Sequence, residues 1–145
     1  MVLSITNIFL ADDDEDDQFM FQEALREIHA PTKLVTASDG EQLMEVLLSL
    51  NGKLPDVLFL DLNMPRKNGF QCLCEIRQNE KFSSLRTVIF STSYEVEVIE
   101  KLYENGADHY VKKPTEFSEL KVIIERVLGI IGTPFVRPSI ERFVL

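Results

Sequence analysis

The chain has 145 residues, a length that fits one domain with a single hydrophobic core. Hydrophobic residues make up 45% and charged residues 27%, the balance of a folded globular protein rather than a disordered one. A net charge of −9 argues against nucleic-acid binding, and no apolar run approaches the roughly 20 residues that cross a bilayer.

Short β-rich runs alternate along the chain with longer segments of helical period. In chain order we expect strands at residues 5–11, 33–37, 57–61, 87–91 and 109–111. Three of these contain unbroken apolar runs (IFLA, VLFL and VIF), which are typical of parallel strands buried on both faces. The alternation predicts a doubly wound α/β fold, a five-stranded parallel sheet with helices on both faces.

The segments between the strands carry apolar residues at spacings of three or four. These repeats, which place their members on one helix face, are Phe21, Leu25 and Ile28, then Leu43, Leu47 and Leu50, then Leu120, Ile124 and Val127. Asp14 is expected to cap the first helix and Asp39-Gly40 to open the second. Asn51-Gly52 should close the second helix, and Gly106 should end the fourth.

Ligands of such sheets bind outside the carboxyl ends of the central strands. Here those ends carry three aspartates from Asp12, then Asp61, a Ser91-Thr92-Ser93 run, and Lys112-Lys113. Clustered carboxylates need a counter-charge, and Mg²⁺ suits a site with few carboxylates and several waters. Together with a hydroxyl and a lysine, which would offset charge on a transferred phosphoryl group, these residue types indicate a phosphoacceptor site.

The string VLFLDLNMPRKNGF resembles the acceptor segment of response-regulator receiver domains, the family of the chemotaxis regulator. The likeness continues in order through FLADDD, ASDGEQL, VIFSTS and GADHYVKKP, over roughly residues 5–128. It implies a flavodoxin-like fold with strand order 2-1-3-4-5 and two-component signalling. In this resemblance a histidine kinase or phosphotransfer protein donates the phosphoryl group, and Mg²⁺ is the cofactor.

The resemblance also assigns roles residue by residue. Asp61 matches the phosphorylated aspartate, Asp13 the direct metal ligand, and Asp12 an acid that reaches the metal through water. Asn63 would offer its backbone carbonyl to the metal, and Lys113 would bind the phosphoryl group.

Three further expectations come from the same likeness. Ser91 resembles the hydroxyl that moves toward the phosphate, with Thr92 as the competing register. Tyr110 resembles the aromatic side chain that rotates inward with it, although an ordinary half-buried strand tyrosine is the alternative. Lys112 competes with Lys113 for the lysine role, and the Lys113-Pro114 bond would be cis.

The leading function is a stand-alone regulator that signals through an unknown downstream protein or onward phosphotransfer, and is not an enzyme beyond its own phosphorylation and dephosphorylation. A phosphatase with an aspartyl-phosphate intermediate would place a general acid two residues after the nucleophile, where Asn63 stands. A phosphorylation-independent module of this fold usually lacks one of the key residues, and a flavin carrier would not place six acids, Asp12 to Asp17, at its first loop.

Residues 1–128 are expected to form the receiver domain and residues 129–145 a short extension. Pro134 and Pro138 exclude one continuous helix in that extension, and its apolar residues predict packing onto the domain, with a homodimer contact as the alternative. Cys72 and Cys74 are interpreted as ordinary thiols of a reducing compartment. The start of the chain lacks the basic region of a signal peptide, so the cytoplasm is the expected location.

Overall fold

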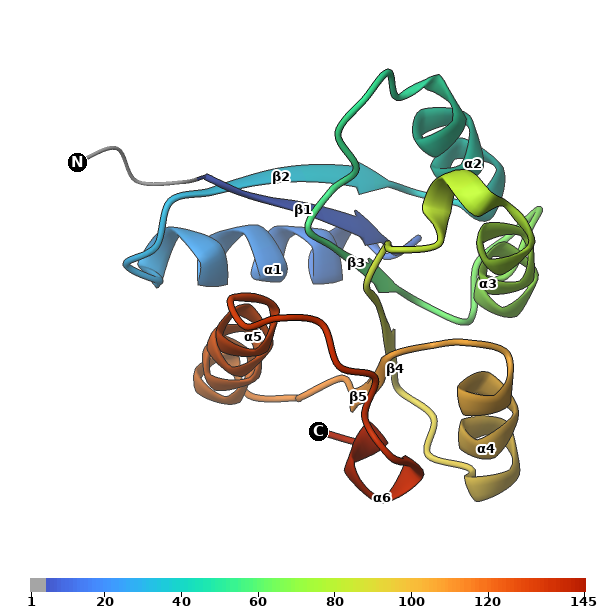
Figure 1. Ribbon diagram of the computed structural model, residues 1–145. Coiled ribbons are helices and arrows are strands. Elements are labelled where there is room, and N and C mark those ends of the chain that lie inside the picture. The colour runs from blue at the N-terminus through green and yellow to red at the C-terminus, as the bar shows by residue number, and fades with distance from the viewer. Residues whose placement is uncertain (1–4) are drawn as a thin grey trace.

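The structure is a computed structural model in which residues 5–145 are described (Figure 1). The first four residues of the expected 1–128 domain lie outside this range. The strands are β1 (Thr6–Ala11), β2 (Thr32–Ala37), β3 (Val57–Leu60), β4 (Thr87–Ser91) and β5 (His109–Lys112). All pair in parallel in the order β2-β1-β3-β4-β5, which confirms the predicted fold class and strand order.

Helices cover both faces of the sheet (Figure 1). They are α1 (Glu15–Glu27), α2 (Gly40–Ser49), α3 (Gly69–Gln78), α4 (Val96–Glu104), α5 (Phe117–Ile131) and α6 (Ile140–Phe143), with a 3₁₀ turn η1 (Glu80–Phe82). Helices α1 and α5 lie on one face, and α2, α3 and α4 on the other. None of the helices described between residues 5 and 145 has the length and apolar composition that crossing a bilayer requires.

Alternation along each strand divides the core into two layers. Ile8, Leu10 and Phe59 face α1 and α5, whereas Phe9 and Leu58 face the opposite helices. Every residue of β3 and β4 is buried, as parallel strands in the middle of a sheet require. The three predicted helical repeats point inward, although Ile28 and Leu50 each lie one residue beyond the end of their helix.

Most predicted boundaries agree with the structure within one or two residues. The side chains of Asp14 and Asp39 accept hydrogen bonds from the third residue of their helices, as caps should. Gly106 follows α4 with φ of +98°, a left-handed conformation that glycine adopts without strain. Helix α2 stops at Ser49, before the predicted Asn51-Gly52, because Leu50 already turns to extended backbone. Helix α5 continues to Ile131, past the expected domain end at 128.

A largely buried ion pair joins the amino-terminal ends of β4 and β5, at the end of the sheet opposite to the acidic strand ends. Arg77 of α3 donates to Asp108 Oδ2 at 3.0 Å and to the carbonyl oxygens of Gly106 and Leu85, both at 2.8 Å. Asp108 also accepts the Thr87 backbone N–H at 2.8 Å. Burial raises the pKa of Asp108 and lowers that of Arg77, so each charge depends on the other.

Arg77→Met should therefore destabilise the fold strongly. Removing one partner of a buried pair leaves the other charge uncompensated, which costs about 3–5 kcal/mol of unfolding free energy. Urea denaturation followed by circular dichroism measures the change. Arg26→Met is the matched control, because Arg26 pairs with Glu23 at the surface and should change stability by less than about 0.5 kcal/mol. Similar midpoints for both variants would contradict the assignment of Arg77 as a structural anchor.

Candidate functional site

Polar residues converge at the carboxyl ends of β1, β3, β4 and β5. The parallel ladder continues one residue past the ends of β1 and β3. The Asp12 N–H donates to the Ala37 carbonyl at 2.9 Å, and the Asp61 N–H donates to the Ala11 carbonyl at 2.9 Å. At the far side the Lys113 N–H donates to the Ser91 carbonyl at 2.8 Å. These bonds fix the backbone of the site residues as firmly as that of the sheet.

Three carboxylates form a cluster at this end of the sheet. Carboxylate oxygens of Asp12, Asp13 and Asp61 all lie within 4.8 Å of one another. Asp12 is fully buried, Asp61 nearly so, and Asp13 is exposed. The backbone packs so tightly behind Asp61 that a Cβ at Gly69 would lie 2.2 Å from its carbonyl oxygen, so this position requires glycine.

Lys113 is the cation of the cluster. Its Nζ lies 2.8 Å from Asp12 Oδ2, 2.8 Å from Asp17 Oδ2 and 3.2 Å from Asp61 Oδ2. The contact with Asp17, in the first turn of α1, was not predicted, because that residue was assigned no role beyond membership of the acidic block. Its one sequence signal was its place in the first turn after β1, which brings side chains to this edge. One ammonium is thus shared among three carboxylates.

The shared lysine does not neutralise the cluster. Burial raises the pKa of Asp12 to about 6, and the contacts with Lys113 only partly oppose the shift. Burial also raises the pKa of Asp61 against the same lysine. Burial alone would lower the pKa of Lys113, but its contacts with Asp12 and Asp17 outweigh that effect and raise it. The lysine is therefore charged, and the acids are short of positive charge.

The donor set fits a hard divalent cation. Asp12 Oδ2 is buried and accepts no hydrogen bond, since the approach of Lys113 at 2.8 Å lies outside hydrogen-bond geometry. The Lys113 ammonium that approaches this oxygen is shared with Asp17 and Asp61, so a further cation would stabilise the cluster. Carboxylate oxygens are the ligands that Mg²⁺ prefers, and the exposure of Asp13 leaves room for water.

The raised pKa of Asp12 predicts that pH acts on stability in opposite directions in the metal-free and the metal-bound protein. In the metal-free protein the favourable contribution of this group is present below its unfolded pKa of 3.8 and is lost as pH rises through about 6. A cation binds the deprotonated acids, so its stabilising effect should grow over the same range. We expect MgCl₂ to raise the melting temperature clearly at about pH 7.5 and little at about pH 5.

Differential scanning fluorimetry at both pH values, with and without MgCl₂, checks this expectation. Asp12→Asn is the control, because it should remove the magnesium response at both pH values. An equal gain in melting temperature at both pH values would contradict a site that titrates with Asp12.

The hydroxyl run at the end of β4, Ser91-Thr92-Ser93, has one buried, one exposed and one half-buried member. Ser91 is fully buried and Thr92 is exposed, which favours the predicted register with Ser91. The Oγ of Ser91 lies 3.4 Å from Ser93 Oγ and accepts the Ser93 N–H at 3.4 Å. Within residues 5–145 no hydrogen bond joins Ser91 to Asp61, so the expected approach of this hydroxyl is not made here.

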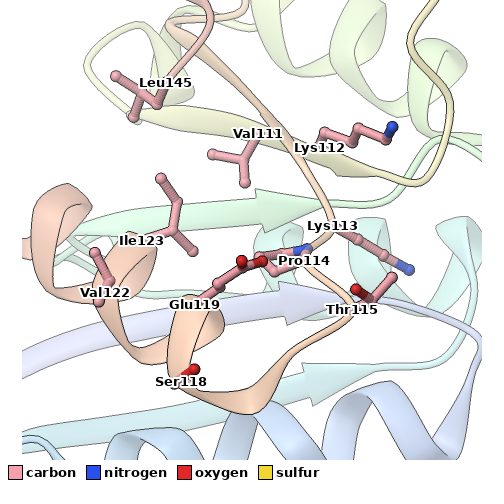
Figure 2. Close-up of a pocket in the computed structure, with 10 residues that line it drawn as sticks. All are labelled: Val111, Lys112, Lys113, Pro114, Thr115, Ser118, Glu119, Val122, Ile123 and Leu145. Carbon is pink, nitrogen blue, oxygen red and sulfur yellow. The ribbon is translucent and has the colours of Figure 1, made fainter.

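The two lysines at the end of β5 differ in exposure, and Figure 2 shows both of them beside the groove between β5 and α5. Lys112 is exposed and Lys113 reaches the acids, which is the placement that alternation along the strand predicts. Lys113 turns its amine away from a groove of about 540 Å³ between β5 and α5, which Val111, Ile123 and Leu145 line. The expected cis Lys113-Pro114 bond is wrong: no peptide bond among the described residues is cis, and trans is the intrinsically preferred form.

Tyr110 is already in an inward position. Its side chain is fully buried, and its hydroxyl donates to the Ser93 carbonyl. The predicted inward rotation therefore has no outward starting point in this structure. The remaining predicted residue, Asn63, is exposed two positions after Asp61 and donates its N–H to Asp61 Oδ1 at 3.4 Å.

Comparison with known proteins supports one family. The profile of the response regulator receiver domain matches residues 8–125. The chain belongs to the response regulator receiver family. Response regulator Rcp1 of Synechocystis sp. is 27% identical over 124 residues, which cover 83% of this chain and 84% of that protein.

Two solved structures have the same architecture. The phosphorylated cyanobacterial phytochrome response regulator RcpA superposes with a TM-score of 0.82 at 30% identity, covering 94% of this chain and all of that one. The Mn²⁺-bound form of Rcp1 superposes with a TM-score of 0.78 at 25% identity, covering 92% of this chain and 99% of that one. The receiver is thus a signalling module of two-component systems, a family that takes its phosphoryl groups from histidine kinases or phosphotransfer proteins.

Proposed function

We propose that Asp61 accepts a phosphoryl group from the phosphohistidine of a histidine kinase or a phosphotransfer protein, in a Mg²⁺-dependent reaction. The observation that carries this proposal is the position of Asp61: buried at the end of β3, 3.2 Å from the Lys113 ammonium and within one cluster with Asp12 and Asp13. The relative RcpA crystallised in a phosphorylated form, which supports such chemistry in this family.

The metal site would be formed by Asp12, Asp13, Asp61 and the backbone carbonyl of Asn63. When bound, Mg²⁺ supplies positive charge to the phosphoryl oxygens and to the excess carboxylates. The unsatisfied Oδ2 of Asp12 supports this assignment, as does the Mn²⁺-bound form of Rcp1.

The chain's own residues perform the transfer. A carboxylate oxygen of Asp61 attacks phosphorus, the P–N bond to the donor imidazole breaks, and the imidazole leaves with a proton from solvent. Charge in the transition state lies mainly on the equatorial phosphoryl oxygens. Lys113 stands beside Asp61 and offsets that charge, provided that it gives up part of its contact with Asp17. Ser91 is the hydroxyl that would donate to the same oxygens.

The conformational signal would be carried by residues of the same site. Phosphate on Asp61 would draw Ser91 and the backbone after β4 toward it, and Tyr110 responds because its hydroxyl binds the Ser93 carbonyl. We propose residues 1–128 as the receiver domain and 129–145 as a short extension of a stand-alone, cytoplasmic phosphorelay protein that signals to a downstream protein. Loss of the phosphate to water resets it, and no other enzymatic activity is assigned.

Incubation with acetyl phosphate and MgCl₂, followed by tandem mass spectrometry, tests the proposal. One phosphoryl group should be found on Asp61, stable in acid and labile in base, and EDTA should prevent its formation. Modification of a different residue, or none in the presence of Mg²⁺, would overturn the assignment.

A further inference from the structure

The C-terminal segment, residues 132–145, folds back along the free edge of the sheet (Figure 1). Val144 forms a parallel bridge with Tyr110 of β5, and the Leu145 N–H donates to the Tyr110 carbonyl at 2.9 Å. The Tyr103 hydroxyl of α4 donates to the Pro138 carbonyl at 2.9 Å. The segment is therefore held by hydrogen bonds to both β5 and α4, and the predicted packing onto the domain is what the structure has.

Phe143 is the apolar anchor of this segment. It is fully buried although it lies in a single helical turn near the end of the chain. Its ring meets Tyr103 edge-on with centroids 5.2 Å apart, and it packs against Tyr110 with centroids 6.4 Å apart. Tyr110 is thus contacted by the segment through both its ring and its backbone.

From Tyr110 the contacts continue to the acidic cluster. The Tyr110 hydroxyl donates to the Ser93 carbonyl, and Ser93 contacts the buried Oγ of Ser91 at 3.4 Å through both its N–H and its hydroxyl. The Ser91 carbonyl accepts the N–H of Lys113, whose amine lies 3.2 Å from Asp61. An unbroken series of contacts joins Phe143 to the residues that would receive a phosphoryl group.

We infer that Phe143 and Val144 are positioning residues: they hold Tyr110 inward and thereby order Ser93 and Ser91 beside Asp61. Docking of the C-terminal segment and occupancy of the phosphoryl site are then coupled, and each favours the other by the same factor. The positioning rests on contacts alone, whereas the coupling to a phosphoryl group rests on the function proposed above. The direction follows from entropy, because a backbone that is already ordered loses less freedom when a ligand binds.

The first arm of the test reads the position of Tyr110 directly. The chain has three tyrosines, so 3-fluorotyrosine labelling gives three ¹⁹F resonances, and Tyr110→Phe identifies the one of interest. Phe143→Ala should shift or broaden this resonance and leave that of the exposed Tyr94 unchanged. Ile140→Ala, on the exposed side of the same turn, is the matched control and should change neither. An unchanged Tyr110 resonance in Phe143→Ala overturns the positioning.

The second arm measures the coupling in the full-length protein. Beryllofluoride with MgCl₂ serves as the probe for a phosphoryl group, and its affinity is obtained by ¹⁹F titration. Phe143→Ala should weaken binding by at least about fivefold, Phe143→Leu should restore most of it, and Ile140→Ala should bind as the wild type does. Hydrogen exchange of the Leu145 amide should slow when the wild type binds the probe.

The outcomes separate the two proposals. Equal beryllofluoride affinity in wild type and Phe143→Ala overturns the coupling. A wild-type protein that does not bind beryllofluoride with Mg²⁺ overturns the acceptor assignment and the coupling with it, while the tyrosine spectra still decide the positioning. Circular dichroism of each variant checks that the sheet is intact, so that a lost resonance can be assigned to the segment and not to global unfolding.

Discussion

Asp61→Asn is expected to abolish phosphoryl uptake while leaving the fold intact. Asparagine keeps the shape of the side chain, but its amide is not the charged nucleophile that attacks phosphorus. Burial raises the pKa of Asp61, which means that the fold tolerates the neutral form of this side chain better than the charged one. The unfolding free energy should therefore change by about 1 kcal/mol or less.

The measurement is incorporation of label from phosphorylated histidine kinase or acetyl phosphate, with urea denaturation alongside. Asp16→Asn is the matched control, because Asp16 belongs to the acidic block Asp12 to Asp17 but is exposed in the first turn of α1. It should be labelled as the wild type is. An acid-stable, base-labile phosphoryl group on Asp61→Asn would show that another residue is the acceptor.

The sequence was sufficient for the parts of the site that backbone topology determines. Parallel strands buried on both faces leave a strong apolar signal, and their carboxyl ends must share one edge, so Asp12, Asp61 and Lys113 could be brought together without coordinates. The need for glycine at position 69 was not predicted. That need arises from the approach of the Asp61 carbonyl across the loop, which no local pattern reports.

The features that were missed depend on side-chain conformation and on tertiary contacts. Asp17 contacts Lys113 only because α1 begins at a particular angle to β1, which sequence spacing does not fix. Tyr110 was expected to rotate, but Phe143, more than thirty residues later in the chain, already packs on its ring. The extension was expected to pack on the domain, but its path along β5 could not be predicted. That path depends on the parallel bridge between Val144 and Tyr110, which no sequence pattern reports.

Lys113→Met should lower phosphoryl uptake, raise the affinity for Mg²⁺ and lower stability. Methionine is close to lysine in length and fills the same space without the charge. Phosphoryl uptake should fall by roughly two orders of magnitude, the effect of removing one preorganised donor from a transition state that carries negative charge. The affinity for Mg²⁺ should rise, because the variant lacks the ammonium that competes with the metal for Asp12 and Asp61 in the wild type.

The third change is in stability. Asp12 is fully buried and Asp61 nearly so, and without Lys113 their charges face each other in the metal-free protein. Loss of the partner from such a group costs about 3–5 kcal/mol near neutral pH. The loss should shrink in acid, where the carboxyls are protonated, and should shrink again when MgCl₂ replaces the missing charge. Urea denaturation at two pH values, with and without MgCl₂, measures all of these differences.

Lys112→Met supplies the control from the neighbouring position. Its side chain is exposed, whereas that of Lys113 reaches the acids, so the variant should retain wild-type uptake, Mg²⁺ affinity and stability. If Lys112→Met lost uptake and Lys113→Met kept it, the lysine assignment would be reversed. A Lys113→Met protein with unchanged Mg²⁺ affinity would show that the ammonium and the metal do not share the buried oxygens of Asp12 and Asp61. The cation could then not reach Oδ2 of Asp12, a buried carboxylate oxygen that accepts no hydrogen bond.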